Sequence, residues 1–431
     1  MKCKTYIYLA VFLASLLACK KTGMDMPCSD DPCATNACSP EECDIFLDST
    51  FMGLDTLWAT AAGVITGNIQ NVAQSSDQIF INLILLQGHE VLSFDKNNGD
   101  LLWRFNNPEA PYFSDMHFHK GSQRLVLQSD HWITSVNALT GEMISDAKPE
   151  GYSASASYGS LIGDYYYMPV RLPDESAGYV LKSHVTDLIE WDEVYEVKKS
   201  QVDGNRPSIN SMNQWIHPET SDEILLLQHR MAFPRRIDLV AYNMTADSMY
   251  WWHKDIEPAG NSNIGQIGVV DGRAIFQGSE ILHCFDIKTG ELQWSIDGRP
   301  DRGYMTAFSN IVDLKNGNII VTVRDVSDPS TTSEYITQKI NLEDGNILRE
   351  LHIHTGYVNR VYKNGYLFGS GRERIVNINS GWSYWSEVDN NNLGIYDILV
   401  DEDRQLYYGI YGGIVQDDAR LMAWDISDYL D

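Results

Sequence analysis

Histidine pairs at alternate positions are the residues whose spacing best suits metal binding. His117 and His119 lie in the segment "HFH", and His352 and His354 lie in "HIH". Side chains two positions apart on a strand point to one face, so each pair can offer two imidazole nitrogens to one ion. The two pairs lie far apart in the sequence, and a histidine on a polar face or in a turn is the commoner explanation. We therefore expect no metal site.

Other stretches that could do chemistry lack the required pattern. Three adjacent carboxylates in "DEDR" (Asp401, Glu402, Asp403) do not have the spacing or the glycine of a calcium loop. The segment "SASASYGS" resembles neither a nucleophile elbow nor a phosphate loop, and "NSNIGQIG" lacks the G-x-G-x-x-G order. We expect no catalytic residue, no cofactor-binding residue and no enzymatic activity.

Four cysteines stand five positions apart in "CSDDPCATNACSPEEC": Cys28, Cys33, Cys38 and Cys43. An even number of cysteines in an exported chain indicates two disulfides, for which three pairings are possible. A four-thiolate zinc site is the alternative, although none of the spacings is the usual C-x2-C. Cys284 stands alone in a strand-like run, where we expect a buried, unreactive thiol.

The amino terminus has the composition of a secretory signal. Residues 1–18 combine Lys2 and Lys4 with an apolar run. This run is too short for a stable transmembrane span. The run ends in "LLAC", which resembles the bacterial lipobox, in which cleavage leaves a lipid-bearing cysteine. The resemblance implies lipidation at Cys19, a Cys-rich stalk over 19–50 and a membrane tether at the cell envelope. Ordinary secretion, with Cys19 merely near the cut, is the alternative.

The formal net charge of the 431-residue chain is −27. Phosphate binding needs a Lys/Arg surface, so this charge argues against nucleic acid as a partner. It argues equally against electrostatic adsorption to anionic lipid. The simplest reading of the acidity is a well-solvated surface.

One phrase recurs along the chain. "FDKNNGDLLW" begins at Phe94, and "FDIKTGELQW" begins at Phe285. In both, glycine stands four positions after an aspartate and tryptophan eight positions after it. The same spacing finds eight anchors, of which Ser183 is the weakest internal match: Asp95, Asn137, Ser183, Asn243, Asp286, Asn341, Asn377 and Asp425. Successive anchors lie 36 to 60 residues apart, a period that predicts a β-propeller with one four-stranded blade per repeat.

Each repeated position of the phrase has a local structural role. Asp or Asn at a strand end can bond the following backbone and start a turn. Glycine supplies the positive φ of a tight turn. A large indole ring suits the space between neighbouring blades and can give its N–H to a partner. The tryptophans to which we assign this structural blade-docking role are Trp58, Trp103, Trp191, Trp251, Trp294 and Trp385.

The last repeat ends too early to contain its outer strand. The segment "LDTLWATAAG", which starts at Leu54, precedes the first repeat and could supply that strand. Closing the ring in this way pairs edges that would otherwise stay open. We therefore expect an all-β propeller over 51–431 with eight blades, the last completed by the N-terminal strand. Imperfect matches at Ser183 and Asn341 leave seven blades as the alternative.

The phrase "FDIKTGELQW" closely resembles the A-x-D-x-x-T-G-x-x-x-W repeat of the pyrroloquinoline-quinone-like (PQQ-like) β-propellers. The resemblance spans residues 54–431, with two nearly perfect repeats. It implies the eight-bladed fold of that family, which includes quinone-dependent alcohol dehydrogenases. The family also includes the cofactor-free lipoprotein subunit of the outer-membrane β-barrel assembly machine, which this chain resembles more in length and anchoring. The adjacent cysteine pair common in the dehydrogenases is missing here.

These observations favour a binding protein over an enzyme. We expect a lipid-anchored envelope scaffold that contacts other envelope proteins and uses no cofactor. The alternatives are a periplasmic quinone-dependent oxidoreductase and a surface protein that binds carbohydrate or peptide. The two longest insertions, Asp203–Pro218 and Arg324–Glu334, are the loops that we expect to carry recognition.

Overall fold

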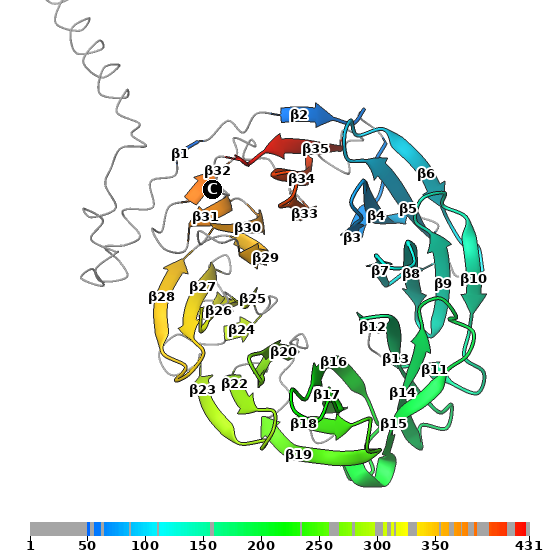
Figure 1. Ribbon diagram of the computed structural model, residues 1–431, viewed down its shortest axis with the longest axis vertical. Helices are drawn as coiled ribbons and strands as arrows, with labels where there is room; N and C mark the ends of the chain where they lie inside the picture. The colour runs from blue at the N-terminus through cyan, green and yellow to red at the C-terminus, as the bar shows by residue number, and fades with distance from the viewer. Residues whose placement is uncertain are drawn as a thin grey trace, which may run out of the picture.

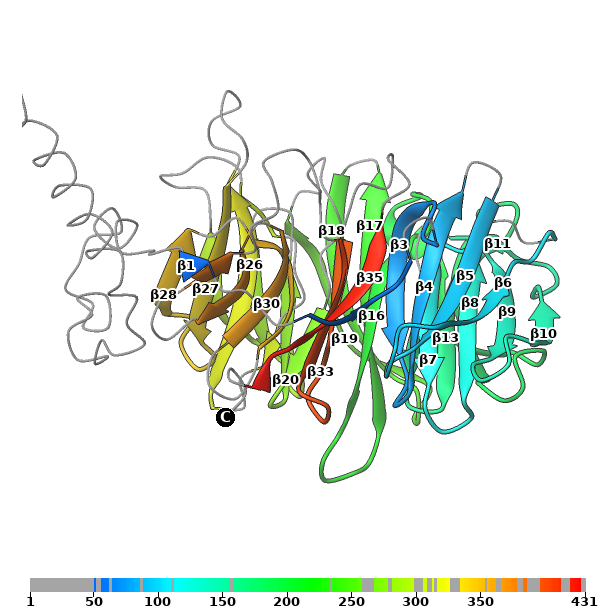
Figure 2. The same ribbon diagram turned by 90° about the horizontal axis from the view of Figure 1, so that it is seen from above.

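The chain forms a ring of β-sheets around a central opening in the computed structural model (Figure 1). Figure 2 shows the same ring edge-on. The structure describes residues 50–51, 56–61, 64–85, 88–109, 112–155, 159–232, 235–257, 267–277, 281–297, 305–307, 312–313, 316–325, 334–352, 355–361, 366–371, 373–377, 383–385, 396–411 and 419–427.

The proposed signal peptide and nearly all of the proposed stalk lie outside these residues. The same holds for five cysteines to which the sequence assigns a role: Cys19, Cys28, Cys33, Cys38 and Cys43. In the part of the chain that is described, no helix is long and apolar enough to cross a membrane.

The first four blades follow the order of the chain. In each, strands pair antiparallel with their neighbours, from the inner strand beside the opening to the outer strand at the circumference (Figure 1). Their strands are β3 (Asn68–Gln74), β4 (Gln78–Leu85), β5 (Gly88–Asp95) and β6 (Leu101–Phe105) in blade 1; β7 (Asp115–His119), β8 (Arg124–Ser129), β9 (Trp132–Asn137) and β10 (Met143–Ala147) in blade 2; β11 (Ser153–Ala154), β12 (Ser160–Ile162), β13 (Tyr165–Arg171), β14 (Ala177–His184) and β15 (Asp192–Lys198) in blade 3; and β16 (Ile209–Ile216), β17 (Glu223–Ala232), β18 (Arg235–Asn243) and β19 (Ser248–Glu257) in blade 4. A single 3-10 turn, η3 (Lys199–Val202), links blades 3 and 4.

The remaining four blades repeat the pattern. In two of the eight blades, two short strands pair with the same neighbour: β11 and β12 with β13 in blade 3, and β24 and β25 with β26 in blade 6. Their strands are β20 (Ile267–Val270), β21 (Arg273–Gln277), β22 (Ile281–Asp286) and β23 (Leu292–Asp297) in blade 5; β24 (Met305–Ala307), β25 (Val312–Asp313), β26 (Asn318–Asp325), β27 (Glu334–Asn341) and β28 (Ile347–His352) in blade 6; β29 (Thr355–Val361), β30 (Tyr366–Gly371), β31 (Glu373–Asn377), β32 (Ser383–Trp385) and β1 (Thr50–Phe51) in blade 7; and β33 (Tyr396–Asp401), β34 (Leu406–Tyr411), β35 (Arg420–Asp425) and β2 (Thr56–Ala59) in blade 8.

The ring closes through strands from the two ends of the propeller. β2 pairs antiparallel with β35, with Thr56 opposite Trp424 and Ala59 opposite Met422. The backbone N–H of Thr60 extends the ladder by donating to the carbonyl of Leu421 at 2.9 Å. This confirms the expectation that the N-terminal strand completes the last blade. The described residues form eight sheets, which agrees with eight blades rather than the seven-bladed alternative.

The core is divided among the interfaces between blades. Because side chains alternate across a strand, a middle strand packs one set of side chains on each neighbouring blade. In β4, Ile79, Ile81 and Leu83 join the cluster shared with blade 8, whereas Phe80 joins the cluster shared with blade 2. Burial on both faces explains why β4 reads as a nearly continuous apolar run.

Seven of the eight outer strands in the described sheets contain a residue near their start that has no partner opposite it. These β-bulge residues are Leu57, Leu102, Ile144, Val194, Tyr250, Gln293 and Leu348. A bulge increases the local twist and interrupts the ladder. In four of these blades the next residue is the tryptophan of the repeated phrase, so the bulge turns that ring toward the following blade.

One of the two predicted recognition loops contains a strand of the ring. Half of Asp203–Pro218 forms β16, the inner strand of blade 4, so the prediction of a recognition loop over this whole segment is wrong. In Arg324–Glu334, the first two residues end β26 and the last begins β27. The residues between them lie outside the described part of the chain.

Candidate functional site

The tryptophans of four blades contact the turn of the blade that follows. Each indole N–H donates to the carbonyl of the residue after the repeat anchor: Trp58 to Lys96 at 3.0 Å, Trp103 to Ala138 at 3.1 Å, Trp251 to Ile287 at 2.8 Å and Trp294 to Leu342 at 2.9 Å. Each ring also covers the turn glycine four residues after the anchor. These contacts join blade 8 to 1, 1 to 2, 4 to 5 and 5 to 6.

Trp191 has a different position from the other tryptophans of the phrase. It precedes β15 and packs against a cluster formed by blades 2 and 3, and its Nε1 has no hydrogen-bond partner in the described structure. Tyr195, which follows the bulge of β15, occupies the slot that tryptophan fills elsewhere. Its ring packs against Tyr242 of blade 4, and its hydroxyl lies 3.1 Å from Nε2 of His229. The assignment of Trp191 to the docking slot is therefore corrected to Tyr195.

The remaining predicted docking residue, Trp385, ends β32. Only its backbone is described, and it pairs with Glu373. The turn between β14 and β15 explains why the spacing rule missed Tyr195. This turn is longer than the five-residue turn assumed by the rule, so counting from Ser183 stops at Trp191, before the strand begins.

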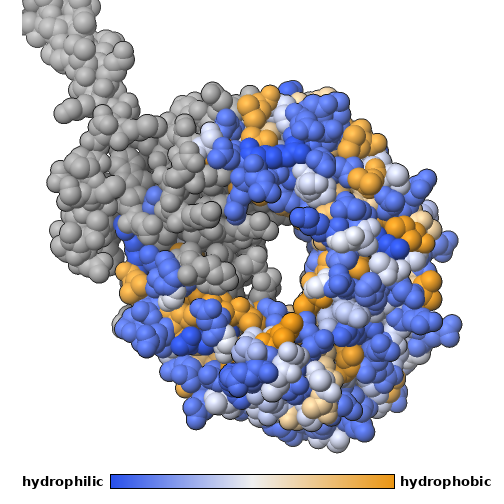
Figure 3. Space-filling view, in the orientation of Figure 1, coloured by the Kyte–Doolittle hydropathy of each residue, from blue (hydrophilic) through white to orange (hydrophobic). Residues whose placement is uncertain are grey.

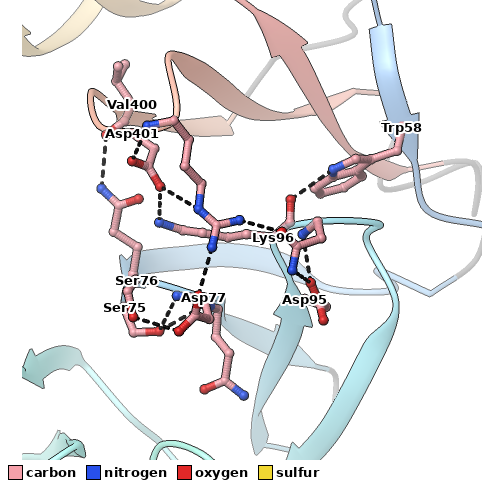
Figure 4. Close-up of polar contacts among 12 residues, drawn as sticks. Trp58, Ser75, Ser76, Asp77, Asp95, Lys96, Val400 and Asp401 are labelled. Carbon is pink, nitrogen blue, oxygen red and sulfur yellow. Dashed lines mark hydrogen bonds and ion pairs between the residues drawn. The ribbon is translucent and has the colours of Figure 1, made fainter.

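A buried ion pair crosses the junction where blade 8 meets blade 1 (Figure 4). Lys96 is 2% exposed, and its Nζ lies 2.6 Å from Oδ2 of Asp401. Burial lowers the pKa of the Lys96 ammonium, and the hydrogen bond that Lys96 donates to Asp401 raises it. Arg404 extends the contact, because its guanidinium binds Asp77 at 2.8 Å and Asn97 at 2.8 Å. Asp401 of the "DEDR" segment thus has a structural role in closing the ring.

Polar side chains connect the inner strands of blades 1 and 2. The amide of Asn71 on β3 donates to Oδ1 of Asp115 on β7 at 3.2 Å, and Oδ2 of Asp115 lies 2.8 Å from Nε2 of His117. Side chains of Asp115 and His117 are 21% and 28% exposed. The His117 ring meets the edge of Tyr166, a buried phenol whose pKa is raised by burial and further by the charge of Asp115. This group, beside the central opening, can offer a carboxylate and an imidazole to a polar ligand (Figure 1).

The two histidines of the first metal-spaced pair bind different partners in the described structure. His117 binds Asp115, whereas His119 binds Ser122 at 2.8 Å and Asp164 at 3.0 Å. Within the described residues no three His, Cys, Asp or Glu side chains are placed to hold a metal ion. His352 ends β28 and His354 lies outside the described residues.

Large aliphatic side chains gather at the circumference of blades 1 and 2. We call these five residues the rim surface: Leu101 (37% exposed), Leu102 (45%), Leu139 (59%), Met143 (54%) and Ile144 (43%). Figure 3 shows hydrophobic residues in orange along the outer edge over β6 and β10. Leu139 belongs to the turn that carries Gly141, and Trp103 fixes that turn to β6. The contact therefore fixes the turn that carries Leu139 against the outer strand that carries Leu101 and Leu102.

Sequence reasoning missed the rim surface although its signal is present in the repeat. The position six residues after each anchor is aliphatic in six repeats: Leu101, Met143, Ile189, Met249, Leu292 and Ile347. All six side chains are exposed, because the outer strand has no further blade strand to cover it. In blades 1 and 2, which are adjacent, this residue is followed by an exposed aliphatic bulge residue, Leu102 and Ile144. Leu57, the bulge residue of β2 in blade 8, is also exposed.

Comparisons with known proteins agree on the fold. No protein-family profile matches the chain, and no curated protein sequence matches it. Among solved structures, a europium-containing methanol dehydrogenase aligns with a TM-score of 0.56 at 10% identity, over 86% of this chain and 93% of the other. BamB from Moraxella catarrhalis aligns with a TM-score of 0.51 at 15% identity, over 88% and 99% of the two chains.

A third similar structure is dihydro-heme d1 dehydrogenase NirN in complex with DHE. It aligns with a TM-score of 0.54 at 11% identity, over 82% of this chain and 72% of that one. Sequence identities this low carry information on architecture and none on chemistry. The eight sheets and these three likenesses together show that the chain has a β-propeller fold.

Proposed function

We propose that the protein is a lipid-anchored scaffold of the bacterial cell envelope that binds other proteins and catalyses no reaction. The anchor at Cys19 rests on the sequence. The observation that carries the binding role is the rim surface, because adjacent exposed aliphatic side chains on a rigid fold mark protein-binding sites. The contact between Trp103 and the turn of blade 2 supports the proposal further, since a surface that is already ordered loses little entropy on binding.

Charges beside the rim surface indicate the chemistry of the partner. Asp100 precedes Leu101, and Glu142 precedes Met143, and both carboxylates are exposed. An apolar segment flanked by Lys or Arg would bury the aliphatic residues and pair these carboxylates at the edge of the contact. We therefore propose a partner surface with an apolar centre and a basic border.

A second candidate function is recognition of a small polar ligand, such as a carbohydrate, beside the central opening. The half-exposed Asp115 and His117 favour it, because a carboxylate and an imidazole can bind sugar hydroxyls. The likeness to two dehydrogenases is a likeness of fold and adds no catalytic residue to either candidate.

Affinity capture from solubilised envelopes tests the protein-binding role. The intact chain should retain one or more envelope proteins. The double variant Leu102→Asp, Ile144→Asp should retain at least tenfold less of them, because each carboxylate would be desolvated in the contact. Leu292→Asp is the matched control, since Leu292 occupies the same repeat position in blade 5, is 52% exposed, and is followed by the polar Gln293.

Equal capture by the intact chain and the rim double variant would refute the rim surface as the binding site. If the intact chain instead captured glycan, and the Asp115→Asn variant did not, the result would favour recognition of a small polar ligand. Dye reduction by the purified chain after addition of quinone and calcium would overturn the non-catalytic role.

A further inference from the structure

In seven of the described sheets the outer strand has an open edge, and each of these edges is interrupted. An exposed strand edge offers unpaired N–H and C=O groups to any extended segment that approaches it. A bulge makes such pairing difficult, because it twists the edge and breaks the regular spacing of these groups. Seven outer strands in the described sheets carry such a bulge, including Leu102 in β6 and Leu348 in β28.

Blade 7 is the exception among the described sheets. Its outer strand β32 pairs residue by residue with β31: Ser383 lies opposite Val376 and Tyr384 opposite Ile375. The irregularity in this pair falls on the inner partner, where Arg374 is skipped between Glu373 and Ile375. The outer edge of β32 is therefore regular where the other seven edges are not.

The same edge is the one that receives an additional outermost strand. β1 pairs parallel with β32, with Thr50 opposite Tyr384 and Phe51 opposite Trp385 (Figure 1). Every other ladder between strands of the described sheets is antiparallel, and no other outer strand is paired on its outward side. The one regular edge and the one added strand thus coincide, as expected if regularity is what permits pairing.

The pairing of β1 is short but is favoured by chain connectivity. Two residues form the ladder, so few hydrogen bonds hold β1 in place. Only residues 52–55 separate β1 from β2, which keeps β1 close to blade 7 at a high effective concentration. A segment of another protein that paired with all three residues of β32 could replace such a short strand once it was bound nearby.

We propose that the outer edge of β32 is a strand-addition site, which β1 occupies in the free protein and which accepts an extended segment of a partner protein. The proposal rests on the protein-binding role proposed above and adds a second, backbone-mediated contact to it. Recognition at this edge would come from main-chain hydrogen bonds, so the partner segment must be extended and must lack proline at the paired positions. The bulged rim of blades 1 and 2, by contrast, would bind through side chains.

A peptide with the sequence of β1 and its flanking residues tests the strand-addition site. The probe is a fluorescent peptide of residues 46–55, with a photoreactive phenylalanine analogue at position 51. The full chain carrying Phe51→Pro should bind it saturably, because proline at Phe51 weakens β1. The intact chain should bind it at least tenfold more weakly, and cross-links should fall on residues 383–385. The same peptide with proline at position 51 is the control and should not bind.

Three results would overturn the proposal: no binding to a folded Phe51→Pro chain, equal binding to both chains, or cross-links spread over the bulged edges. Dimerisation of the Phe51→Pro chain without peptide would assign the edge to a second copy and would also overturn it. If Phe51→Pro does not fold, the intact chain with excess probe gives the same cross-link readout. Capture through the rim surface is measured separately with the double variant Leu102→Asp, Ile144→Asp. Failure of the strand-addition proposal can therefore be told apart from failure of the proposed protein-binding role.

Discussion

Trp103 of blade 1 lies directly against Gly141 of blade 2. A Cβ atom at position 141 would come within 2.7 Å of ring atom Cδ2, closer than nonbonded carbon atoms approach. The glycine also has a φ of +75°, where a side chain is strained whatever its surroundings. Two separate physical requirements therefore select glycine at this position, one from the turn and one from the neighbouring blade.

Gly141→Ala should lower the free energy of unfolding by about 2–5 kcal/mol. Strain at positive φ contributes about 1–2 kcal/mol and the clash with Trp103 about 1–3 kcal/mol. Gly151→Ala is the matched control, because Gly151 has a φ of +81° and nothing within 4 Å of the added Cβ. Urea unfolding of both variants measures the difference, and equal losses would show that the ring of Trp103 moves aside freely.

Trp103→Phe and Trp191→Phe should differ in their effect on stability. Replacing Trp103 removes the hydrogen bond to the Ala138 carbonyl at 3.1 Å and should cost about 1–2 kcal/mol. Replacing Trp191 removes a buried Nε1 without a partner in the described structure and should change the free energy of unfolding by less than about 0.5 kcal/mol. Comparable losses in urea unfolding would instead place Trp191 in the docking slot.

The repeat predicted the fold because its information is local. In blade 1, the N–H of Gly99 donates to the Asp95 carbonyl at 2.9 Å, so aspartate and glycine belong to one five-residue turn. A fixed spacing finds such turns and the strands around them. It fails at Tyr195, since the turn before β15 is longer and shifts the docking residue along the strand. Ring closure was predictable for a similar reason, because one strand was missing at one end and present at the other.

The repeat pattern could not predict contacts between residues far apart in the sequence. Lys96 and Asp401 are 305 residues apart, and neither occupies the Asp, Gly or Trp slot of the phrase. Their contact depends on how blade 8 meets blade 1, which no single repeat contains. The rim surface was missed for another reason: its residues recur visibly, but their exposure follows from the position of the outer strand and the bulge beside it.

Asp401→Asn should destabilise the protein by about 3 kcal/mol. The substitution leaves the buried ammonium of Lys96 without a charged partner, and removing one member of a buried pair costs about 3–5 kcal/mol. The double variant Lys96→Met, Asp401→Asn should recover much of the loss, because no unpaired charge remains buried.

Glu223→Gln provides the comparison for this ion pair. Lys182 and Glu223 lie 3.2 Å apart with side chains 17% and 40% exposed, so the loss should stay below about 1 kcal/mol. Losses of the same size for Asp401→Asn and Glu223→Gln, or a double variant no more stable than Asp401→Asn, would show that burial of Lys96 does not control the stability of this junction.

Acid should destabilise the protein through two buried histidines. Burial lowers the pKa of His229 to about 3 and that of His283 to about 4, from an ordinary value of 6.5. As the pH falls below 6.5, the unfolded chain takes up protons that the folded protein does not, so stability decreases until the folded pKa values are reached. Each histidine contributes a slope of about 1.4 kcal/mol per pH unit between pH 6 and pH 4.

His283→Leu separates the contribution of one of these histidines. Both ring nitrogens of His283 are buried without a partner in the described structure, and the ring stacks on Phe276 at 15°. Leucine removes two unsatisfied polar atoms, so stability at pH 7 should be unchanged or higher. Urea unfolding at pH 7, 6 and 5 should give a shallower loss for the variant, by about 1.4 kcal/mol per pH unit below pH 6. Identical slopes for variant and intact chain would mean that the folded protein protonates His283 as readily as the unfolded chain does.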